Sequence, residues 1–361
     1  MKTKLNVGLI GAGWWAAEAH LPALQSHPDA ELVALQSRKP EKAAKLAKQF
    51  GAKAALQSAE ELLDYPGLDA VVISTTPNVH FAQAKGALER GLHVLIEKPM
   101  TMTAAESKEL VELADRKGLT FLISCPWHYT RHGILARERV ARGDLGDIRM
   151  ISVLMTNFTI GFYEGKSFAE VYAGGDGVDA SLVPEIEPNR ASYSDPATAG
   201  GGQIYTNASH IFAYLKFLTG LEPVEVSARF ANANTAVDVF DVLHIAFAGG
   251  TLASMATGGT HADLERAFEI RVIGSNGVLV LELWSGHMRL RLRGGILEEP
   301  APLAADEIYP KFAPALNFVD AALGKAPNQS PATLGHYAMR LIEGSCRSAA
   351  TGAPVSLAGI P

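Results

Sequence analysis

The first segment that could do chemistry is a glycine-rich turn near the start of the chain. Gly11-Ala12-Gly13-Trp14-Trp15-Ala16 directly follows the apolar run Leu5–Ile10. In such a turn the first glycine allows a tight bend, and the second lets the backbone approach a pyrophosphate at the start of the following helix. A plain glycine-rich turn is the alternative. The segment predicts a dinucleotide site with contacts from Gly11, Ala12, Gly13, Trp14 and Trp15.

The second segment places a lysine beside a carboxylate. Glu97-Lys98-Pro99 directly follows another apolar run, His93–Ile96. Pro99 favours an extended backbone at Lys98, which would direct the lysine away from the strand end. Hydride transfer to a carbonyl leaves negative charge on oxygen, and an ammonium can stabilise that charge and supply the proton. Ligands of open parallel sheets lie beyond the carboxyl ends of the strands. The two segments together predict an oxidoreductase with Glu97 and Lys98 near the cofactor; a solvated surface ion pair is the alternative.

Residues at the end of the second predicted strand indicate which dinucleotide binds. An NAD site usually has Asp or Glu there, which holds the ribose 2′-hydroxyl. This chain has Ser37-Arg38-Lys39 instead, a hydroxyl and two cations that would attract a 2′-phosphate. We therefore expect NADP, bound in part by Ser37 and Arg38, with NAD as the alternative. Arg38 and Lys39 could instead be solvated residues that lead into a helix.

A third polar cluster begins at the last residue of the apolar run Ala70–Thr75 and extends to His80. Hydroxyl and amide groups at the carboxyl end of a strand can contact ribose or phosphate. They can also cap the next helix, as Thr76 or Asn78 would, and the two roles can coexist. We expect cofactor contacts from Thr75, Thr76, Pro77, Asn78 and His80.

In the second half of the chain, Gly200-Gly201-Gly202 leads into a predicted helix that carries Thr206 and His210. These two residues are four apart, so they would share one helical face. A histidine, with an ordinary pKa of about 6.5, suits general acid–base chemistry, and a structural histidine is the alternative. Trp127-His128-Tyr129 begins this half, where an aromatic ring could pack on nicotinamide or sugar, or in the core.

The elements that would position the first-half residues alternate between strands and helices over residues 1–124. Short apolar runs without alternation are typical of strands buried on both faces of a parallel sheet. Ser58 and Thr103 each precede a glutamate by three residues, the pattern of a capping box, and Gly51, Gly91 and Gly118 stand at expected helix ends. We predict an α/β, doubly wound parallel sheet. Its strands are expected at Asn6–Ile10, Glu31–Gln36, Ala70–Thr75, His93–Ile96 and Thr120–Ile123.

Residues 125–361 show a different pattern, which predicts an α+β domain with a large, mostly antiparallel sheet. One helix, Ile204–Leu218, interrupts the strands, and the chain is helical again from Pro310. Residues 161–199 are rich in Gly, Pro, Asp and Ser without a period, so we expect this segment to be functional or mobile and to select substrate near Arg190. Strands are expected at Ile148–Thr156, Val224–Phe230, Val239–Phe247, Thr251–Thr257, Phe268–Ile273, Val278–Leu283 and Met288–Leu292.

Composition excludes several classes of partner. The 361 residues are 48% hydrophobic and 19% charged, with a net charge of −6 and no long basic run, which argues against nucleic-acid binding. No apolar stretch has the length of a membrane span. The two cysteines cannot form a disulfide framework, which favours a reducing compartment. We expect a cytoplasmic protein with no metal site; the start of the chain resembles a secretory signal only faintly.

The quoted motifs identify a family. The chain resembles the glucose–fructose oxidoreductase, inositol dehydrogenase and rhizopine-catabolism (Gfo/Idh/MocA) family from end to end, through Gly11-x-Gly13, Thr76-Pro77, Glu97-Lys98-Pro99 and the glycines before His210. This resemblance implies an N-terminal Rossmann domain and a C-terminal domain with an open-faced sheet that often builds an oligomer interface. It also implies NAD(P)-dependent oxidation or reduction of a CH–OH group in a sugar, cyclitol or related polyol. Lys98 would be the catalytic lysine and His210 the acid–base histidine.

One position departs from the family pattern. The second-domain motif commonly reads Asp-x-x-x-His, and this chain has Thr206 in place of the aspartate. A threonine cannot hold a charge, so Lys98 and His210 would suffice or another group would help. Candidate helpers are Thr206 itself, Tyr205, Asn207, His128, Tyr129 and the loop carboxylates Asp176, Asp179 and Glu185.

Two other functions stay open because of this departure. One is a non-redox enzyme that oxidises its substrate transiently for elimination or glycosidic cleavage. The other is a non-catalytic protein that senses a dinucleotide. For all three functions we expect a homo-oligomer, a dimer or tetramer, because Val239–Phe247 carries apolar residues on both alternations, too many for a wet face.

Overall fold

The structure is a computed structural model that describes residues 3–173, 186–261 and 266–361. The chain divides into two compact units. The first contains Met1–Pro126, a short stretch ending at Asn189, and Lys311–His336; the second contains Trp127–Leu182, Arg190–Pro310 and Tyr337–Pro361. A single boundary between residues 124 and 125 therefore leaves out a later part of the chain that belongs to the first unit.

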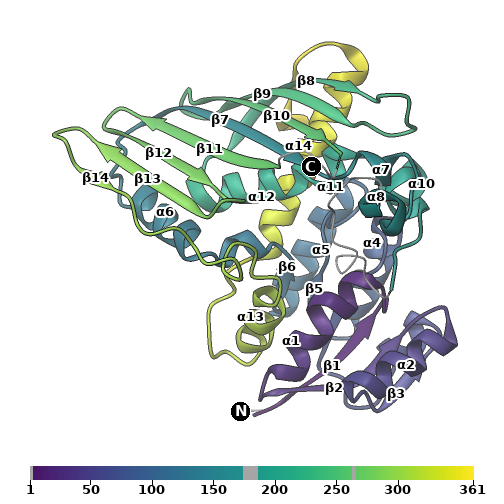
Figure 1. Ribbon diagram of the computed structural model, residues 1–361. Coiled ribbons are helices and arrows are strands. Elements are labelled where there is room, and N and C mark those ends of the chain that lie inside the picture. Colours follow the sequence, from purple (N-terminus) through teal and green to yellow (C-terminus); the bar gives the residue numbers. More distant parts are fainter. Residues whose placement is uncertain (1–2, 174–185, 262–265) are drawn as a thin grey trace. The chain divides into compact units, whose positions relative to one another are not determined.

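Within the described residues of the first unit, six parallel strands form one sheet in the order β3-β2-β1-β4-β5-β6 (Figure 1). This order confirms the predicted doubly wound sheet. The strands are β1 (Leu5–Ile10), β2 (Ala30–Gln36), β3 (Ala54–Leu56), β4 (Ala70–Ile73), β5 (His93–Ile96) and β6 (Phe121–Ile123). The sequence analysis missed β3, because a three-residue edge strand is too short to produce an apolar run.

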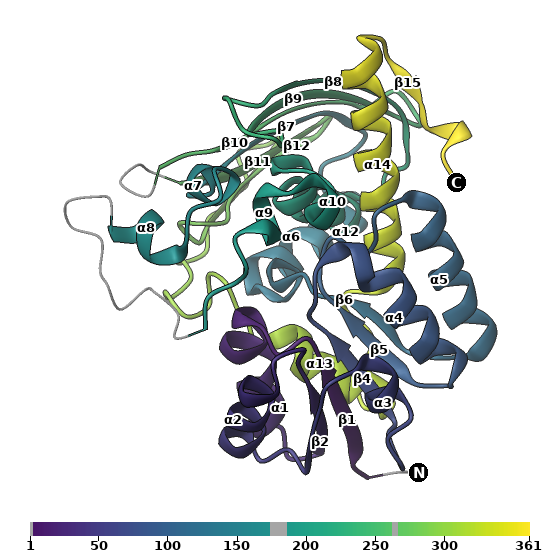
Figure 2. The same ribbon diagram turned by 90° about the vertical axis from the view of Figure 1, so that its right-hand side faces the viewer.

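Helices cover both faces of this sheet (Figure 2). The first helix begins with a π-helical segment, Ala16–His20, and continues as α1 (Leu21–Ser26). The others are α2 (Pro40–Phe50), α3 (Ala59–Leu63), α4 (Pro77–Glu89), α5 (Ala104–Lys117) and α13 (Ala313–Ala322). Both predicted capping boxes are present, at Ser58 and Thr103, and the three predicted glycines have left-handed φ values of 76°, 77° and 63°.

One layer of the core lies between the sheet and the helices α1, α2 and α13. Val7 and Leu9 of β1 pack there with Leu24 of α1, Leu46 of α2 and Phe318 of α13. All five side chains are at most 1% exposed. Helix α13 thus completes the core of a unit whose other helices come from the first third of the chain.

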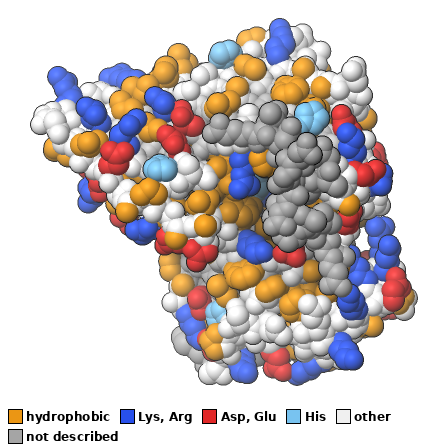
Figure 3. All heavy atoms as spheres, in the orientation of Figure 1, with side chains coloured by type: hydrophobic (Ala, Val, Ile, Leu, Met, Phe, Trp, Pro, Cys, Tyr) orange, Lys and Arg blue, Asp and Glu red, His pale blue; other side chains and the backbone are white. Residues whose placement is uncertain are grey.

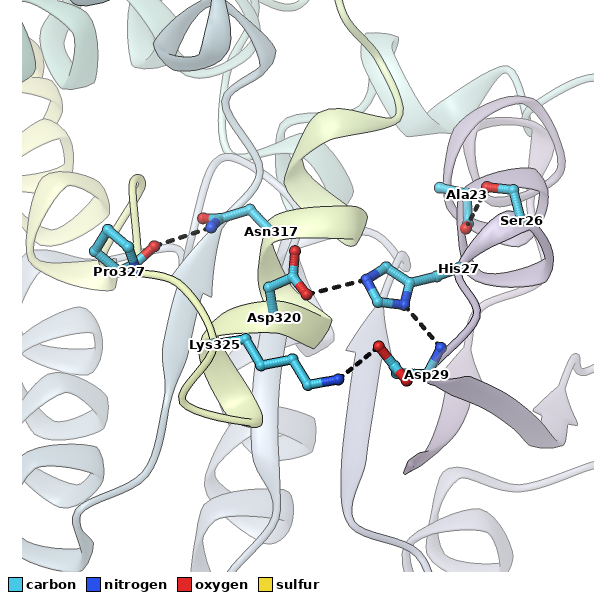
Figure 4. A network of polar contacts seen from close by, with 8 residues as sticks. All are labelled: Ala23, Ser26, His27, Asp29, Asn317, Asp320, Lys325 and Pro327. Atoms are coloured by element: carbon cyan, nitrogen blue, oxygen red, sulfur yellow. Dashed lines mark hydrogen bonds and ion pairs between the residues drawn. The ribbon is translucent and has the colours of Figure 1, made fainter. Parts of the chain in front are cut away.

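Polar contacts hold the α13 segment against the start of β2 (Figure 4). The Nε2 atom of His27 lies 3.3 Å from the carboxylate of Asp320, and the ammonium of Lys325 lies 2.6 Å from that of Asp29. The backbone N–H of Asp29 donates to Nδ1 of His27. These polar contacts add to the packing of Phe318 in holding residues 311–336 within the first unit, a contact that no local sequence pattern indicates.

In the described part of the second unit, nine strands form a mixed sheet in the order β14-β13-β12-β11-β7-β10-β9-β8-β15. Only β7 and β10 pair in parallel among these strands, so the predicted mostly antiparallel sheet is confirmed. The strands are β7 (Ile148–Asn157), β8 (Pro223–Ala231), β9 (Phe240–Phe247), β10 (Leu252–Gly259), β11 (Ala267–Gly274), β12 (Gly277–Glu282), β13 (His287–Leu292), β14 (Leu297–Glu298) and β15 (Val355–Ser356).

The helices of the second unit differ from the prediction at one important point. The single helix expected at Ile204–Leu218 is two helices, α11 (Gln203–Thr206) and α12 (Ala208–Thr219). They are separated at Asn207, whose backbone φ is −107°, and whose side-chain amide donates to Oε1 of Gln203 at 2.8 Å. The others are α6 (Arg131–Ala141), α7 (Ile160–Tyr163), α8 (Phe168–Ala173), α9 (Ala191–Ser194), α10 (Pro196–Ala199) and α14 (Ala332–Thr351), which begins in the first unit.

The surface carries charges of both signs. Arg289 and Arg291 of β13 are exposed while Leu290 between them is buried, as the alternating pattern predicts. Lys and Arg side chains gather over this end of the sheet, with Asp and Glu among them (Figure 3). Among residues 3–173, 186–261 and 266–361, no helix is long and apolar enough to cross a membrane, and no group of three or more His, Cys, Asp or Glu residues could hold a metal ion.

Candidate active site

The glycine-rich turn lies where β1, β2 and β4 end. Gly11 has a φ of 87°, and a Cβ there would lie 2.6 Å from the carbonyl oxygen of Ser74, so only glycine fits. The backbone N–H of Gly11 donates to the carbonyl of Gln36 at 3.2 Å. At Gly13, by contrast, a Cβ would meet no described protein atom closer than 3.8 Å. The protein itself does not require glycine at this second position, which fits a backbone that a pyrophosphate must approach.

The carboxylate of Glu97 connects the helix after this turn to the end of β5. Its Oε1 atom accepts a hydrogen bond from the indole N–H of Trp15 at 2.8 Å and lies 2.8 Å from Nε2 of His20. Its Oε2 atom accepts from the backbone N–H of Lys98 at 3.3 Å. The two motifs that the sequence analysis singled out, around Gly11 and Lys98, are therefore joined through one side chain.

The ionisation of Glu97 follows from these contacts. Glu97 is 8% exposed, and burial alone would raise the pKa of its carboxyl group. The hydrogen bond from His20 and the charges of His20 and Lys98 outweigh that effect, so the pKa is lowered and the group is a carboxylate at neutral pH. Glu97 is thus a buried structural acceptor, which excludes a solvated surface ion pair. The sequence analysis missed His20, because nothing local marks a histidine of a helix as a partner of a distant strand end.

Lys98 is only partly exposed, beside Glu97 and Cys125. Burial lowers the pKa of its ε-amine, and the nearby charge of Glu97 opposes this shift. The peptide bond between Lys98 and Pro99 is cis. A lysine with a lowered pKa is a better proton donor near neutral pH than an ordinary exposed lysine.

The residues expected to choose the cofactor lie at the end of β2, next to the turn. Ser37 is 8% exposed, and its Oγ atom accepts from the backbone N–H of Lys39 at 3.2 Å. Arg38 and Lys39 are exposed. Lys42 follows on α2, where burial and then the charge of Lys39 lower its pKa. Three cations thus gather here, the arrangement that an additional phosphate would stabilise.

The third predicted cluster is divided between surface and interior. The hydroxyl of Thr75 donates to Oε1 of Gln83 at 2.7 Å, and that of Thr76 donates to Oδ1 of Asn78 at 2.7 Å. Thr76 is the N-cap residue of α4 and Pro77 its first residue. His80 is fully buried, with Nδ1 3.0 Å from the carbonyl oxygen of Pro99 and Nε2 3.2 Å from that of Thr75. His80 therefore contacts the loop after β5 from the protein interior.

In the second unit, a buried carboxylate holds the glycine-rich turn before α11. Asp238 accepts hydrogen bonds from the backbone N–H groups of Gly202 at 2.9 Å and Ile204 at 2.6 Å. A Cβ at Gly202 would lie 1.9 Å from the carbonyl oxygen of Asp238, so a larger residue cannot fit. Burial and the charge of Asp238 raise the pKa of neighbouring Asp241 to about 9. The sequence analysis missed both aspartates.

Thr206, at the position where the family pattern has aspartate, belongs to a network of neutral side chains. Its hydroxyl donates to the carbonyl of Gly202 at 2.7 Å and contacts the hydroxyl of Tyr163. Tyr163 donates to Oε1 of Gln203 at 2.7 Å. Asn207 also belongs to this network. Asp176, Asp179 and Glu185, which were candidates to supply the missing carboxylate, lie outside the described residues.

His210 is 5% exposed and follows the break at Asn207. Its ring meets that of Trp127 edge to face, with centroids 5.2 Å apart. The prediction placed Thr206 and His210 on one helix. Because α11 ends at Thr206 and α12 begins at Ala208, the two residues belong to different helices. Thr206 places a neutral hydroxyl where the pattern has an aspartate, so the pair differs in kind from Asp-x-x-x-His.

Two of the remaining candidates of the second unit, His128 and Tyr205, pack against their neighbours. His128 is fully buried and stacks on Phe217 with centroids 4.6 Å apart; burial and then the charge of Arg137 lower its pKa to about 3. It therefore stays neutral in the core. Tyr205 is 9% exposed, and its ring fills the space beside Gly200. Tyr129 is half-buried.

Comparison with known proteins agrees with this geometry. Residues 5–124 match the model of an oxidoreductase family with an NAD-binding Rossmann fold, and residues 134–280 match the GFO/IDH/MocA C-terminal domain. The chain belongs to the Gfo/Idh/MocA family of oxidoreductases. This confirms the resemblance drawn from its motifs.

Three curated relatives show how far the similarity extends. An uncharacterized oxidoreductase of Synechocystis is 31% identical over 60% of this chain and 52% of its own length. A dTDP-3,4-didehydro-2,6-dideoxy-alpha-D-glucose 3-reductase of Saccharopolyspora spinosa is 27% identical over 85% of both chains. The scyllo-inositol 2-dehydrogenase (NADP(+)) of Bacillus subtilis is 22% identical over 71% of this chain and 63% of its own length. The chain thus spans about half the length of the first of these relatives.

Solved structures share the fold over nearly the whole chain. An oxidoreductase domain protein from Kribbella flavida has a TM-score of 0.80 at 22% identity and covers 98% of this chain and 99% of its own. Levoglucosan dehydrogenase in complex with NADH has a TM-score of 0.77 at 20% identity, with coverage of 98% and 99%.

The environment of Lys98 gives a prediction that needs no substrate. The ε-amine of Lys98 should titrate below the pKa of about 10.4 of an exposed lysine, because burial lowers it. Glu97→Gln removes the charge that opposes this shift, so the midpoint should fall further. NMR titration of protein with ¹³C-methylated lysines, assigned with Lys98→Arg, measures both midpoints.

A matched control is Glu109→Gln, which removes an exposed carboxylate paired with Lys85 on α4. This variant should leave the Lys98 midpoint unchanged. An upward shift in Glu97→Gln, or a Lys98 that titrates with the exposed lysines, would contradict the assigned environment.

Proposed function

We propose that this protein transfers a hydride between NADP(H) and a CH–OH group of a sugar, cyclitol or related polyol. The observation that carries the proposal is the set of hydrogen bonds made by the Glu97 carboxylate. It accepts from the indole of Trp15, just after the glycine-rich turn, and from the backbone N–H of Lys98, whose pKa is lowered. Membership of an NAD-binding oxidoreductase family supports it. The relatives named for a deoxysugar reductase and an inositol dehydrogenase favour polyhydroxylated substrates. Free cysteines 125 and 346 are compatible with the proposed cytoplasmic location.

In this function, some residues of the first unit would bind the cofactor and Lys98 would transfer the proton. Gly11–Trp15 would hold the dinucleotide, with Gly13 giving its pyrophosphate access to backbone N–H groups. The nicotinamide would supply or accept the hydride. Lys98 would stabilise negative charge on the substrate oxygen and give up a proton in reduction, or take one in oxidation. His210 of the second unit is proposed as a second proton-transfer group.

The first prediction of the proposed function concerns turnover. Lys98→Met should lower kcat at least about 100-fold, the smallest contribution expected of a general acid, while dinucleotide still binds because the turn does not need the ammonium. His210→Ala should lower kcat more than it raises KM, since a proton-transfer contact strengthens in the transition state. Absorbance of reduced nicotinamide with a panel of sugars and cyclitols measures turnover.

The control for this experiment is Lys85→Met, an exposed lysine of α4, which should be silent. If Lys98→Met keeps more than about a tenth of the normal kcat, another group transfers the proton. Product formation without net change in absorbance would instead indicate the transient-oxidation enzyme.

The second prediction concerns cofactor choice, which we infer from Ser37 and the neighbouring cations. The unaltered protein should bind NADPH more tightly than NADH. The double variant Ser37→Asp/Arg38→Ala should reverse the preference by about tenfold or more, because a carboxylate repels the 2′-phosphate; each tenfold corresponds to about 1.4 kcal/mol. Titration by protein fluorescence measures the four affinities.

Lys48→Ala on α2 removes an exposed cation further along the helix and should not change the preference. The inference is wrong if the unaltered protein prefers NADH.

The third prediction concerns assembly. The outer face of the second-unit sheet exposes large apolar side chains, and Leu252 at 60% exposed lies directly opposite Met150 at 45%. Such a patch is typical of an interface. We propose that it joins copies of this chain into a dimer or tetramer. The side chains are Met150, Leu154, Val224, Phe240, Val242 and Leu252.

Val242→Glu/Leu252→Glu should reduce the mass measured by light scattering to that of a monomer, because charges would be buried at the interface. Val79→Glu, at an apolar residue of α4 that is 37% exposed, is the control. An unaltered protein that is monomeric at micromolar concentrations would overturn the proposal.

A further inference from the structure

Aromatic side chains from distant parts of the second unit gather around Trp127. Its ring lies edge-on to those of Phe268, Trp284 and Tyr309, at centroid distances of 4.9, 5.0 and 4.7 Å. The fourth neighbour is His210, at 5.2 Å. One buried indole is thus in contact both with the proposed acid–base histidine and with the aromatic cluster.

The outer part of this cluster is accessible. Trp127 is 3% exposed, whereas Trp284 and Tyr309 are half-buried and lie next to each other with centroids 5.7 Å apart. Half-buried aromatic rings offer apolar faces on which the C–H side of a sugar ring can pack. The cluster therefore has the composition of a sugar-binding surface, one ring away from His210.

Arg266 adds a charge to this surface. It is exposed and precedes β11, and its guanidinium lies 4.0 Å from the centroid of the Trp284 ring and 5.7 Å from that of Phe158. A guanidinium held over an aromatic ring interacts through its face. Its N–H donors lie in its own plane and match the two oxygens of a carboxylate or phosphate. Stacking on Trp284 thus orients the Arg266 guanidinium so that its N–H groups can donate to an oxyanion.

The charge of the whole chain makes a local cation necessary for such a ligand. The net charge is −6, so the protein as a whole does not attract anions. An anionic substrate would have to be bound by an individual basic side chain. Arg266 is a basic side chain in direct contact with the aromatic cluster.

We propose that Arg266 and Trp284 form a substrate subsite for a sugar that carries an anionic group, a carboxylate or a phosphate. The proposal rests on the proposed function of His210 and adds a substrate class to it. The sugar ring would pack on the aromatic surface, and its oxyanion would pair with Arg266. A role of Arg266 in covering Trp284 alone is the competing explanation.

The test is binding, which does not depend on turnover. Isothermal titration with D-glucuronate, D-glucose 1-phosphate, UDP-glucose and neutral D-glucose distinguishes a sugar carboxylate, a sugar phosphate and a nucleotide sugar. NADPH should be present throughout, so that the nucleotide sugar does not occupy the dinucleotide turn. At least one of the three anionic sugars should bind more tightly than glucose, and its affinity should fall with added salt.

Variants separate the charge from the packing. Arg266→Ala should weaken binding of that anionic sugar about tenfold or more and leave glucose unchanged, and Arg266→Lys should restore part of the affinity because the charge remains. The control is Arg289→Ala, which removes an exposed arginine from β13 of the same unit. Circular dichroism shows that each variant is folded.

Two outcomes overturn the proposal: anionic sugars that bind no more tightly than glucose, or an Arg266→Ala variant that binds them as well as the unaltered protein. Failure of the proposed function is distinguishable from both. If the unaltered protein oxidises neutral polyols although one of these two binding outcomes is found, the oxidoreductase stands and only the anionic subsite is lost.

Discussion

The structure of the candidate site depends on one buried acceptor, the carboxylate of Glu97. A buried charge is costly unless hydrogen bonds satisfy it. Here the indole of Trp15 and the imidazole of His20 meet the same oxygen, at 2.8 Å each. Loss of either contact would weaken the hydrogen bonding of this buried charge. The helix that follows the glycine-rich turn is therefore fixed relative to the strand end that carries Lys98.

A buried carboxylate also supports the glycine-rich turn of the second unit. Asp238 is 7% exposed and accepts from the backbone of Gly202 and Ile204. In both units a carboxylate from a distant segment supports the glycine-rich region. Asp238 accepts from the backbone of its turn, whereas Glu97 contacts Trp15 and His20 just after the first turn. The neighbours differ: Glu97 is followed by Lys98, whereas Thr206 after the second turn contacts the hydroxyl of Tyr163. Proton transfer would then depend chiefly on groups other than residue 206.

The sequence predicted what local chemistry determines. Unbroken apolar runs located the main strands, and Ser58 and Thr103 located two helix starts, because a capping box is complete within four residues. Features that depend on distant segments were not predictable. They are the contact of His20 with Glu97, the hydrogen bonds of Asp238 to the second glycine-rich turn, and the packing of α13 in the first unit. The edge strand β3 was missed because it is only three residues long. The break at Asn207 was missed because the apolar periodicity continues across it.

A double-mutant cycle between Trp15 and Glu97 tests most directly whether one carboxylate couples the turn to the lysine. The dissociation constant of NADPH is measured for the unaltered protein, Trp15→Phe, Glu97→Gln and the double variant. The account predicts non-additive losses, with a coupling of at least about 0.5 kcal/mol, because Trp15→Phe removes the hydrogen bond and Glu97→Gln removes the negative charge that strengthens it. Trp14→Phe, whose ring lies beside that of Trp15, should add independently to Glu97→Gln. Additive losses for Trp15 and Glu97 would contradict the account.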